Sequence, residues 1–206
     1  VYAGAAPGNH LLTLCHLFPH FHFWAYDPRP FATSLLASPD GPPENLQLRQ
    51  ELFTNSVADS FASLGCTVLF LSDIRTADWQ VDDEVSHDQH LQDDLNSQRQ
   101  WVERICPHAA MLKFRLPYVD GYTDYLDGEL RLPVWGPQTT TECRLVLHAG
   151  WTRKLRKYDH RMLWEQLFYF NTVARVSIYP RPEPEVHCIG RSEELEFLRA
   201  GLCHCF

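Results

Sequence analysis

The chain has 206 residues, of which 45% are hydrophobic and 13% aromatic, so it can form a core and general disorder is excluded. No run approaches the roughly 18 apolar residues of a membrane-spanning helix, so we expect no membrane partner. The net charge of −8 disfavours a protein that binds polyanions all over its surface, whereas residues 99–161, with 11 basic and 7 acidic side chains, are compatible with a local groove for one.

The first ten residues, VYAGAAPGNH, predict a short strand that enters a glycine turn. Residues 11–18 follow with the apolar spacing of a helix. This is the first unit of an open α/β sheet, in which a nucleotide-like ligand meets backbone N–H groups at the turn. Such a turn also serves packing alone, and both interpretations are open. The chain starts without Met inside this strand, so we expect the N-terminal part of the domain to be missing.

The next elements predict further strands of the same sheet. Residues 21–27 form a strand that ends in Asp27, the place where an acid commonly binds ribose hydroxyls. Residues 28–45 are expected to be a loop, residues 48–53 a strand and residues 57–64 a helix closed by Gly65. Residues 66–73 (CTVLFLSD) are nearly all apolar, as expected of a central parallel strand, and end in Asp73.

The second half predicts more strands and two helices. Residues 78–94 are acidic and predict a loop, which leads into a helix through about residue 105. Residues 111–117 (MLKFRLP) alternate, so Lys113 and Arg115 share one face of a strand. Asp127 and Gly128 predict a hairpin turn within residues 125–134. We expect a strand at 142–148, a helix at 159–175 with Asp159 near its start, a final strand at 176–179 and a terminal helix at 192–200.

Cysteine and histidine residues do not indicate a metal site. Seven irregularly spaced cysteines favour reduced thiols in an intracellular protein. The spacing of the late His and Cys residues matches no zinc pattern, so we expect no metal. These residues are His187, Cys188, Cys203, His204 and Cys205.

Three charged residues, Asp73, Lys113 and Glu142, lie on strands that are otherwise apolar. A buried ion-pair network and a catalytic group are both consistent with this pattern. The basic segment 151–161 (WTRKLRKYDHR) is consistent either with contacts to phosphates or with a solvated loop.

Four motifs in order, VYAGAAPGNH, LSDIR, LKFRLPYVD and TECRL, resemble the poxvirus cap-specific mRNA 2′-O-methyltransferases, which double as small poly(A) polymerase subunits. They are also similar to the kinetoplastid cap methyltransferases. The resemblance covers about residues 1–175 and implies one Rossmann-like, S-adenosylmethionine-dependent methyltransferase domain over residues 1–206, with a doubly wound, mostly parallel sheet.

The family's catalytic Lys-Asp-Lys-Glu set maps in part onto this chain. The resemblance assigns the Asp to Asp73, the second Lys to Lys113 and the Glu to Glu142, while the first Lys lies upstream of Val1. A ribose hydroxyl becomes a good nucleophile when its proton is removed, and the enzyme must also align it with the methyl group. We therefore expect Lys113 to be the base, held in orientation by the two carboxylates.

The resemblance also assigns ligand contacts. For S-adenosylmethionine it implies Tyr2, Gly4, Gly8, His10, Asp27, Arg29, Phe53, as a wall of the adenine pocket, and Asp73. For the 7-methylguanosine cap it implies stacking by Tyr118 and acceptance of guanine N–H groups by Asp120 and Asp159, with Arg75, Arg115 and Arg144 near the RNA. The opposing aromatic of the family lies upstream, and a second pocket aromatic is replaced near Thr139. Salt bridging to acids at the sheet edge is the other interpretation of the three arginines.

The resulting hypothesis is an enzyme that methylates a ribose 2′-OH near the 5′ end of capped mRNA. One alternative is an RNA-binding or polymerase-accessory module of the same fold without turnover, and another is a 2′-O-methyltransferase of uncapped RNA. The expected partners are capped mRNA and other capping or polyadenylation proteins. The expected location is the nucleus or a viral factory in the cytoplasm.

Overall fold

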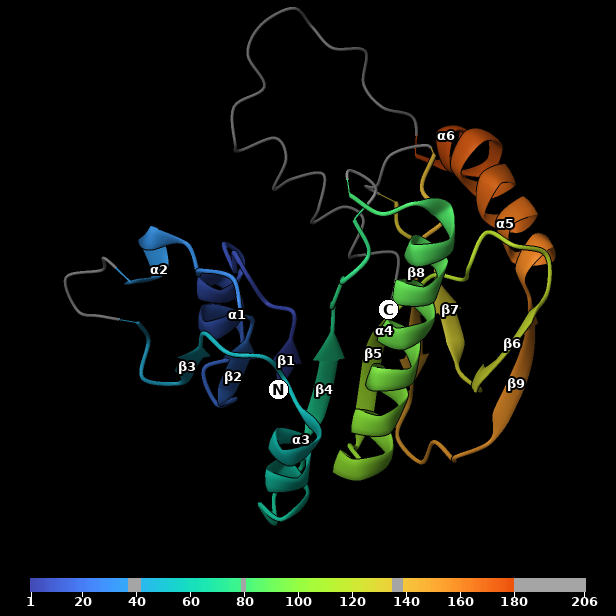
Figure 1. Cartoon of the computed structure of the whole chain (residues 1–206). Coiled ribbons are helices and arrows are strands. Elements are labelled where there is room, and N and C mark those ends of the chain that lie inside the picture. The colour runs from blue at the N-terminus through green and yellow to red at the C-terminus, as the bar shows by residue number, and fades with distance from the viewer. Residues whose placement is uncertain (37–41, 79–80, 135–138, 180–206) are drawn as a thin grey trace, which may run out of the picture.

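The computed structural model describes residues 1–36, 42–78, 81–134 and 139–179. Within these residues the main sheet has seven strands in the order β3-β2-β1-β4-β5-β8-β7 (Figure 1). The strands β1 to β5 are parallel, and β8 runs antiparallel to both of its neighbours. Their bounds are β1 Tyr2–Ala3, β2 Phe23–Tyr26, β3 Leu46–Arg49, β4 Leu69–Ser72, β5 Ala109–Phe114, β7 Glu129–Arg131 and β8 Cys143–Leu147.

The strand order reverses at β1, which pairs with β2 on one side and β4 on the other. This is the doubly wound, Rossmann-like arrangement that the sequence predicts. In such sheets a ligand binds outside the carboxyl ends of the strands at the reversal. The turn after β1 and the residues after β4 are therefore the part of the chain where a site is expected.

Helices and a second, two-stranded sheet complete the structure (Figure 1). Helix α4 packs against α3 and β5, and α5 follows directly on β9. The helices are α1 Leu11–Leu17, α2 Thr33–Leu36, α3 Asn55–Ala62, α4 Glu84–Ile105, α5 His160–Tyr169 and α6 Arg175–Ile178, with a π-helical turn, Phe170–Ala174, between the last two. The small sheet pairs β6 Tyr122–Leu126 with β9 Leu155–Asp159.

The core forms where α4 covers the sheet. Alternate residues of β5, Ala110, Leu112 and Phe114, are buried, and Val102 and Ile105 of α4 lie in the same cluster. Because side chains alternate along a strand, Lys113 lies on the opposite face of β5, away from this cluster. The period-2 pattern thus places a charged residue of β5 at the edge of the cleft described below.

The helix α4 starts earlier than predicted, since residues 84–94 are helical and not a loop. A run of acidic residues predicts a loop when only its composition is considered. In the structure, however, Asp83 is the N-cap of the helix, and its carboxylate accepts the N–H of Ser86 at 2.8 Å. The acidic Asp88 and Asp94 are buried because they accept hydrogen bonds from other segments.

Four more local predictions are wrong. Residues 125–134 do not form a hairpin, because β6 pairs with β9 whereas β7 pairs with β8. Residues 176–178 continue a helix, and no strand forms there. Strand β3 covers residues 46–49 instead of 48–53, and the predicted loop 28–45 contains α2. The predicted terminal helix at 192–200 lies outside the described residues.

Among the described residues, no helix is both long enough and apolar enough to cross a membrane.

Candidate functional site

The glycine turn after β1 touches the end of β4. Gly4 has φ +78, a left-handed conformation that glycine adopts without strain, and its N–H donates to the carbonyl of Tyr26 at 2.8 Å. A Cβ on Gly4 would lie 2.6 Å from the backbone carbon of Asp73. The close approach of these two backbones places Asp73 directly beside the turn.

The carboxylate of Asp27 holds the turn in place. It is buried after β2 and accepts the N–H of Ala6 at 3.0 Å and the N–H of Arg29 at 2.9 Å. Both of its oxygens also accept from the Arg29 guanidinium, each at 3.0 Å. Burial opposes the charged form, but these hydrogen bonds outweigh it and lower the pKa of Asp27.

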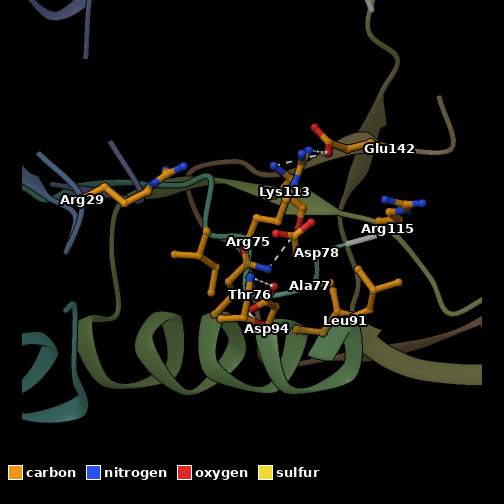
Figure 2. Close-up of a pocket in the computed structure, with 13 residues that line it drawn as sticks. Arg29, Arg75, Thr76, Ala77, Asp78, Leu91, Asp94, Lys113, Arg115 and Glu142 are labelled. Atoms are coloured by element: carbon orange, nitrogen blue, oxygen red, sulfur yellow. Dashed lines mark hydrogen bonds and ion pairs between the residues drawn. The ribbon is translucent and has the colours of Figure 1, made fainter. Parts of the chain in front are cut away.

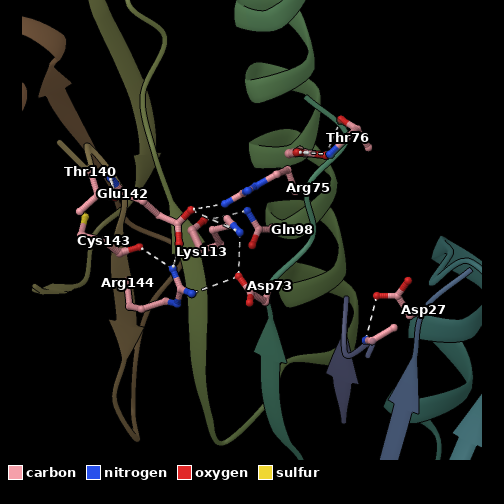
Figure 3. A network of polar contacts seen from close by, with 12 residues as sticks. Asp27, Asp73, Arg75, Thr76, Gln98, Lys113, Thr140, Glu142, Cys143 and Arg144 are labelled. Carbon is pink, nitrogen blue, oxygen red and sulfur yellow. Dashed lines mark hydrogen bonds and ion pairs between the residues drawn. The ribbon is translucent and has the colours of Figure 1, made fainter. Parts of the chain in front are cut away.

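Four charged side chains alternate in sign at the carboxyl edge of the sheet (Figure 3). Lys113 Nζ lies 2.9 Å from Asp73 Oδ1 and 3.3 Å from Glu142 Oε2. Arg144 contacts the same two carboxylates, with Nη2 3.1 Å from Asp73 Oδ1 and Nη1 2.6 Å from Glu142 Oε1. We call these four residues the charge ring. Three separate strands, β4, β5 and β8, bring them together.

A third cation approaches the charge ring from outside. Arg75 Nη2 lies 3.0 Å from Glu142 Oε2, so Glu142 contacts three positive groups. The ion pairs of Arg75 and Arg144 match the salt-bridge interpretation of these arginines. Burial opposes the charge of Glu142, but Lys113 first and then Arg144 and Arg75 overcome it and lower the pKa of Glu142 from 4.5 to about 2.

This depressed pKa predicts an acid-dependent loss of stability. Because the folded-state pKa is below the unfolded value, ionised Glu142 stabilises the fold above about pH 4.5, and this contribution is lost as the pH falls toward 2. Urea unfolding of wild type and Glu142→Gln should therefore differ most near pH 5, and the difference should shrink by about 2 kcal/mol toward pH 2. The exposed Glu51→Gln variant serves as control and should follow the wild type. Parallel curves for wild type and Glu142→Gln would contradict the assignment.

The charge ring borders a cleft of about 480 Å³ between the sheet edge and α4 (Figure 2). The Lys113 side chain is only 13% exposed, yet it lines this cleft together with Glu142. A largely buried amine at the wall of a cleft is arranged to meet a ligand in a controlled direction. The other lining residues are Arg29, Ile74, Arg75, Thr76, Ala77, Asp78, Leu91, Asp94, Leu95, Gln98 and Arg115.

Helix α4 contributes positioning residues that the sequence reading missed. Asp94 accepts the N–H and the hydroxyl of Thr76 at 3.0 and 2.9 Å, which holds the segment after β4. Gln98 donates to the carbonyl of Lys113 at 3.0 Å, which ties α4 to β5. Asp88 accepts the N–H groups of Tyr118 and Val119. These residues could have been predicted from the helical spacing of Leu91 and Leu95. The many acidic residues around them obscured that spacing.

The remaining predicted cofactor residues fall in two places. Tyr2 lies near Asp73, and its ring centroid is 5.6 Å from that of His10. Burial first, and then Asp73, raises the pKa of Tyr2 to about 12. Phe53, in contrast, is buried in the core, with its ring 5.0 Å from that of Trp101, and it lines neither described hollow. Gly8 also has a positive φ and lies against Leu11.

The predicted cap residues are separated. Asp120 and Asp159 line a second hollow, of about 350 Å³, whereas Tyr118 is not among the residues that line it. The Tyr118 hydroxyl bonds with Arg115 and, at 2.9 Å, with the hydroxyl of Thr141, and its ring packs 5.1 Å from that of Trp164. Asp159 is the N-cap of α5, as expected from its place in the sequence, and accepts the N–H of Met162. The structure thus brings together the two carboxylates without Tyr118.

Within the described residues, no group of three or more His, Cys, Asp or Glu side chains is placed to hold a metal ion. The late His and Cys residues, from His187 onward, lie outside the described part of the chain. The basic segment 151–161 is in part β9, and Lys154 of this segment pairs with Asp127 at 3.2 Å.

The residues at the sheet reversal are of the types that commonly hold a nucleoside cofactor. Gly4 allows close approach of backbone, and Asp27 and Asp73 place two carboxylates beside it. An acid beside such a turn commonly accepts ribose hydroxyls, while the charges of Asp27 and Asp73 are already compensated by Arg29 and by Lys113 with Arg144.

Comparisons with known proteins agree with the fold. The family model described as Poly A polymerase regulatory subunit matches residues 1–180. No curated protein sequence matches the chain significantly. Among solved structures, VP4 of bluetongue virus, described as a multifunctional RNA-capping production line, is similar with a TM-score of 0.54 and 14% identity over 81% of this chain. The match spans 28% of the VP4 chain, and at this identity it supports the fold alone.

Proposed function

This chain belongs to the Poly A polymerase regulatory subunit family, and we propose that it transfers a methyl group from S-adenosylmethionine to a ribose 2′-OH near the 5′ end of capped mRNA. The observation that supports this most is the charge ring at the wall of the 480 Å³ cleft, directly beside the glycine turn. A lysine amine, two carboxylates and the glycine turn thus lie at one edge of the sheet, which supports the proposal.

We assign these residues separate roles in the proposed reaction. Asp27, Gly4 and Tyr2 would hold the cofactor, which supplies an activated methyl group on sulfur. Lys113 Nζ would contact the 2′-OH and accept its proton, for which the amine must be in its neutral form. Asp73 and Glu142 would orient the Lys113 amine. Arg144 contacts both carboxylates and Arg75 contacts Glu142, so these arginines compensate the negative charge.

A test of the cofactor assignment uses Asp27→Ala in the complete protein. We expect S-adenosylhomocysteine to bind about 1–3 kcal/mol more weakly, since the variant loses hydrogen bonds to a charged group and releases the turn at Ala6. Isothermal titration calorimetry measures this, with the exposed Asp59→Ala as control, which removes only an ion pair with Arg104. Unchanged affinity in Asp27→Ala would remove Asp27 from the cofactor site, and no binding by the wild type would overturn the proposal.

A test of the reaction compares RNAs that end in 7-methylguanosine, an unmethylated guanosine cap or a triphosphate. The complete protein, with labelled S-adenosylmethionine, should methylate the first of these preferentially and at a ribose 2′-oxygen. Equal use of all three would favour an enzyme for uncapped RNA.

The second candidate is an accessory module that binds RNA for a polymerase. The observation that favours it is the family itself, which is described as a regulatory subunit. In the described structure the Lys113 amine is also engaged by two carboxylates. Tight RNA binding with no methyl transfer would decide for this module.

A further inference from the structure

Two buried polar residues of α4, Asp94 and Gln98, face the segments that carry the charge ring. They lie four positions apart, so their side chains are neighbours on one face of the helix. Asp94 is 7% exposed and Gln98 is 1% exposed, and both line the cleft of about 480 Å³. Figure 2 shows Asp94 pointing from α4 toward Thr76, and Figure 3 shows Gln98 beside Lys113. One turn of α4 therefore meets two of these segments.

Asp94 holds the segment that follows β4. Its Oδ2 accepts the N–H of Thr76 at 3.0 Å, and its Oδ1 accepts the Thr76 hydroxyl at 2.9 Å. Thr76 directly follows Arg75, whose guanidinium contacts Glu142, and it lies three residues after Asp73. Because one carboxylate fixes both the backbone and the side chain of Thr76, it restricts the backbone of the whole short segment.

Gln98 holds the strand on the other side of the ion pair. Its Nε2 donates to the carbonyl oxygen of Lys113 at 3.0 Å, which ties α4 to the backbone of β5. Lys113 Nζ lies 2.9 Å from Asp73 Oδ1, so the ion pair joins the two segments that α4 holds. The separation of Lys113 from Asp73 is thus set by this turn of α4 as well as by the pairing of β4 with β5.

The Asp94 carboxylate has no ion-pair partner within the described part of the chain, and its contacts are those with Thr76. Burial raises the pKa of Asp94, and the hydrogen bonds from Thr76 oppose this shift without overcoming it. A buried acid without a cation beside it is costly to keep, and such groups concentrate at functional sites. A role in the site, beyond stability, agrees with this cost.

From these contacts we propose that Asp94, acting through Thr76, is a positioning residue for methyl transfer and keeps Asp73 and Arg75 in the alignment with Lys113 that turnover requires. This inference rests on the proposed function, since it names a residue that aligns the proposed base. Both oxygens of Asp94 are occupied by Thr76. Its loss should therefore lower kcat more than it changes KM for capped RNA.

The experiment measures kcat and KM of the complete protein with capped RNA. Asp94→Ala should lower kcat by about 10- to 100-fold, since a misplacement of about 1 Å can cost 100-fold. Asp94→Asn should turn over nearly like wild type, because its amide oxygen can accept the Thr76 N–H while its amide nitrogen donates to the hydroxyl. The matched control is Asp93→Ala, which removes an exposed acid next to Asp94 on the same helix and should leave kcat unchanged.

Two further measurements separate positioning from folding and from the enzyme proposal. Val102→Ala creates a cavity in the core under the same helix, outside the cleft, so it should lower the melting temperature without changing kcat. In the RNA-free protein, the side-chain NMR signal of Lys113 reports its contact with Asp73. Asp94→Ala should shift this signal in the same direction as Asp73→Asn does.

Each contrary outcome overturns a defined part. Wild-type kcat in Asp94→Ala, or an unchanged Lys113 signal, would overturn the inference. If Asp94→Asn is as slow as Asp94→Ala, the charge of Asp94 matters instead of its contacts with Thr76, and the positioning role is wrong. An equal loss of kcat in Val102→Ala would reduce the effect to general destabilisation. Absence of methyl transfer by the wild type would overturn the proposed function, while the NMR comparison still decides whether Asp94 aligns Lys113.

Discussion

Replacing Lys113 with alanine is expected to lower methyl transfer to capped RNA by about 100-fold or more, the range for losing a positioned base. Lys113 is the amine that lines the cleft between Asp73 and Glu142. Affinity for S-adenosylhomocysteine should change little, because the amine is proposed to contact the ribose of the RNA. Single-turnover assays with labelled cofactor, with calorimetry for cofactor binding, separate the two effects.

The matched control for this variant is Lys154→Ala. Lys154 is an exposed lysine that pairs with Asp127 at 3.2 Å and does not line the cleft, so its loss should leave turnover unchanged. Lys113→Arg keeps a positive charge between the carboxylates but replaces the amine with a group that stays protonated, so it should be as inactive as Lys113→Ala. Near-normal turnover in either Lys113 variant would show that Lys113 is not the base.

Replacing Gly4 with alanine is expected to destabilise the fold by about 2–5 kcal/mol. Two costs combine. The φ of +78 is strained for any residue with a Cβ, and the new Cβ would lie 2.6 to 2.7 Å from the backbone of Asp73 and Ile74. Because these atoms belong to the backbone, no flexible side chain can move aside, so β1 must separate locally from the segment after β4.

The control for Gly4→Ala is Gly65→Ala. Gly65 also has a positive φ, +65, but a Cβ there would meet nothing within 4 Å, so only the conformational cost of about 1–2 kcal/mol remains. Urea unfolding of both variants isolates the effect of the close approach to Asp73. Equal destabilisation by the two substitutions would show that the contact between β1 and β4 is looser than described.

The strands that carry the charged residues were predictable because their signals are local. The continuous apolar run before Asp73 and the alternation around Lys113 both follow from the geometry of a strand, and β4 and β5 form there. The same holds for the acid after β2, Asp27, and for Asp159 as the N-cap of α5. In each case a few neighbouring residues determine the conformation.

The errors in strand pairing have a different origin. Phe53, by comparison, packs in an aromatic cluster contributed by α3, α4, β2 and β4, and its place at a wall of the adenine pocket stays a prediction. Strand β7 was predicted to pair with the strand before it and pairs with β8. Such choices depend on which distant segments meet, and a local pattern holds no information about its partner.

The sequence by itself determined that Asp73 follows one apolar strand, that Lys113 lies on another and that Glu142 begins a third. The antiparallel orientation of β8, which brings Glu142 to the same sheet edge as Asp73, was decided by the tertiary structure. Tertiary structure alone decided what surrounds them: Arg144 closes the charge ring because β8 inserts beside β5, and Tyr122 faces Asp159 because β6 pairs with β9. The physical reason is that hydrogen-bonded register and side-chain packing join residues tens of positions apart, whereas propensity and periodicity act within a single element.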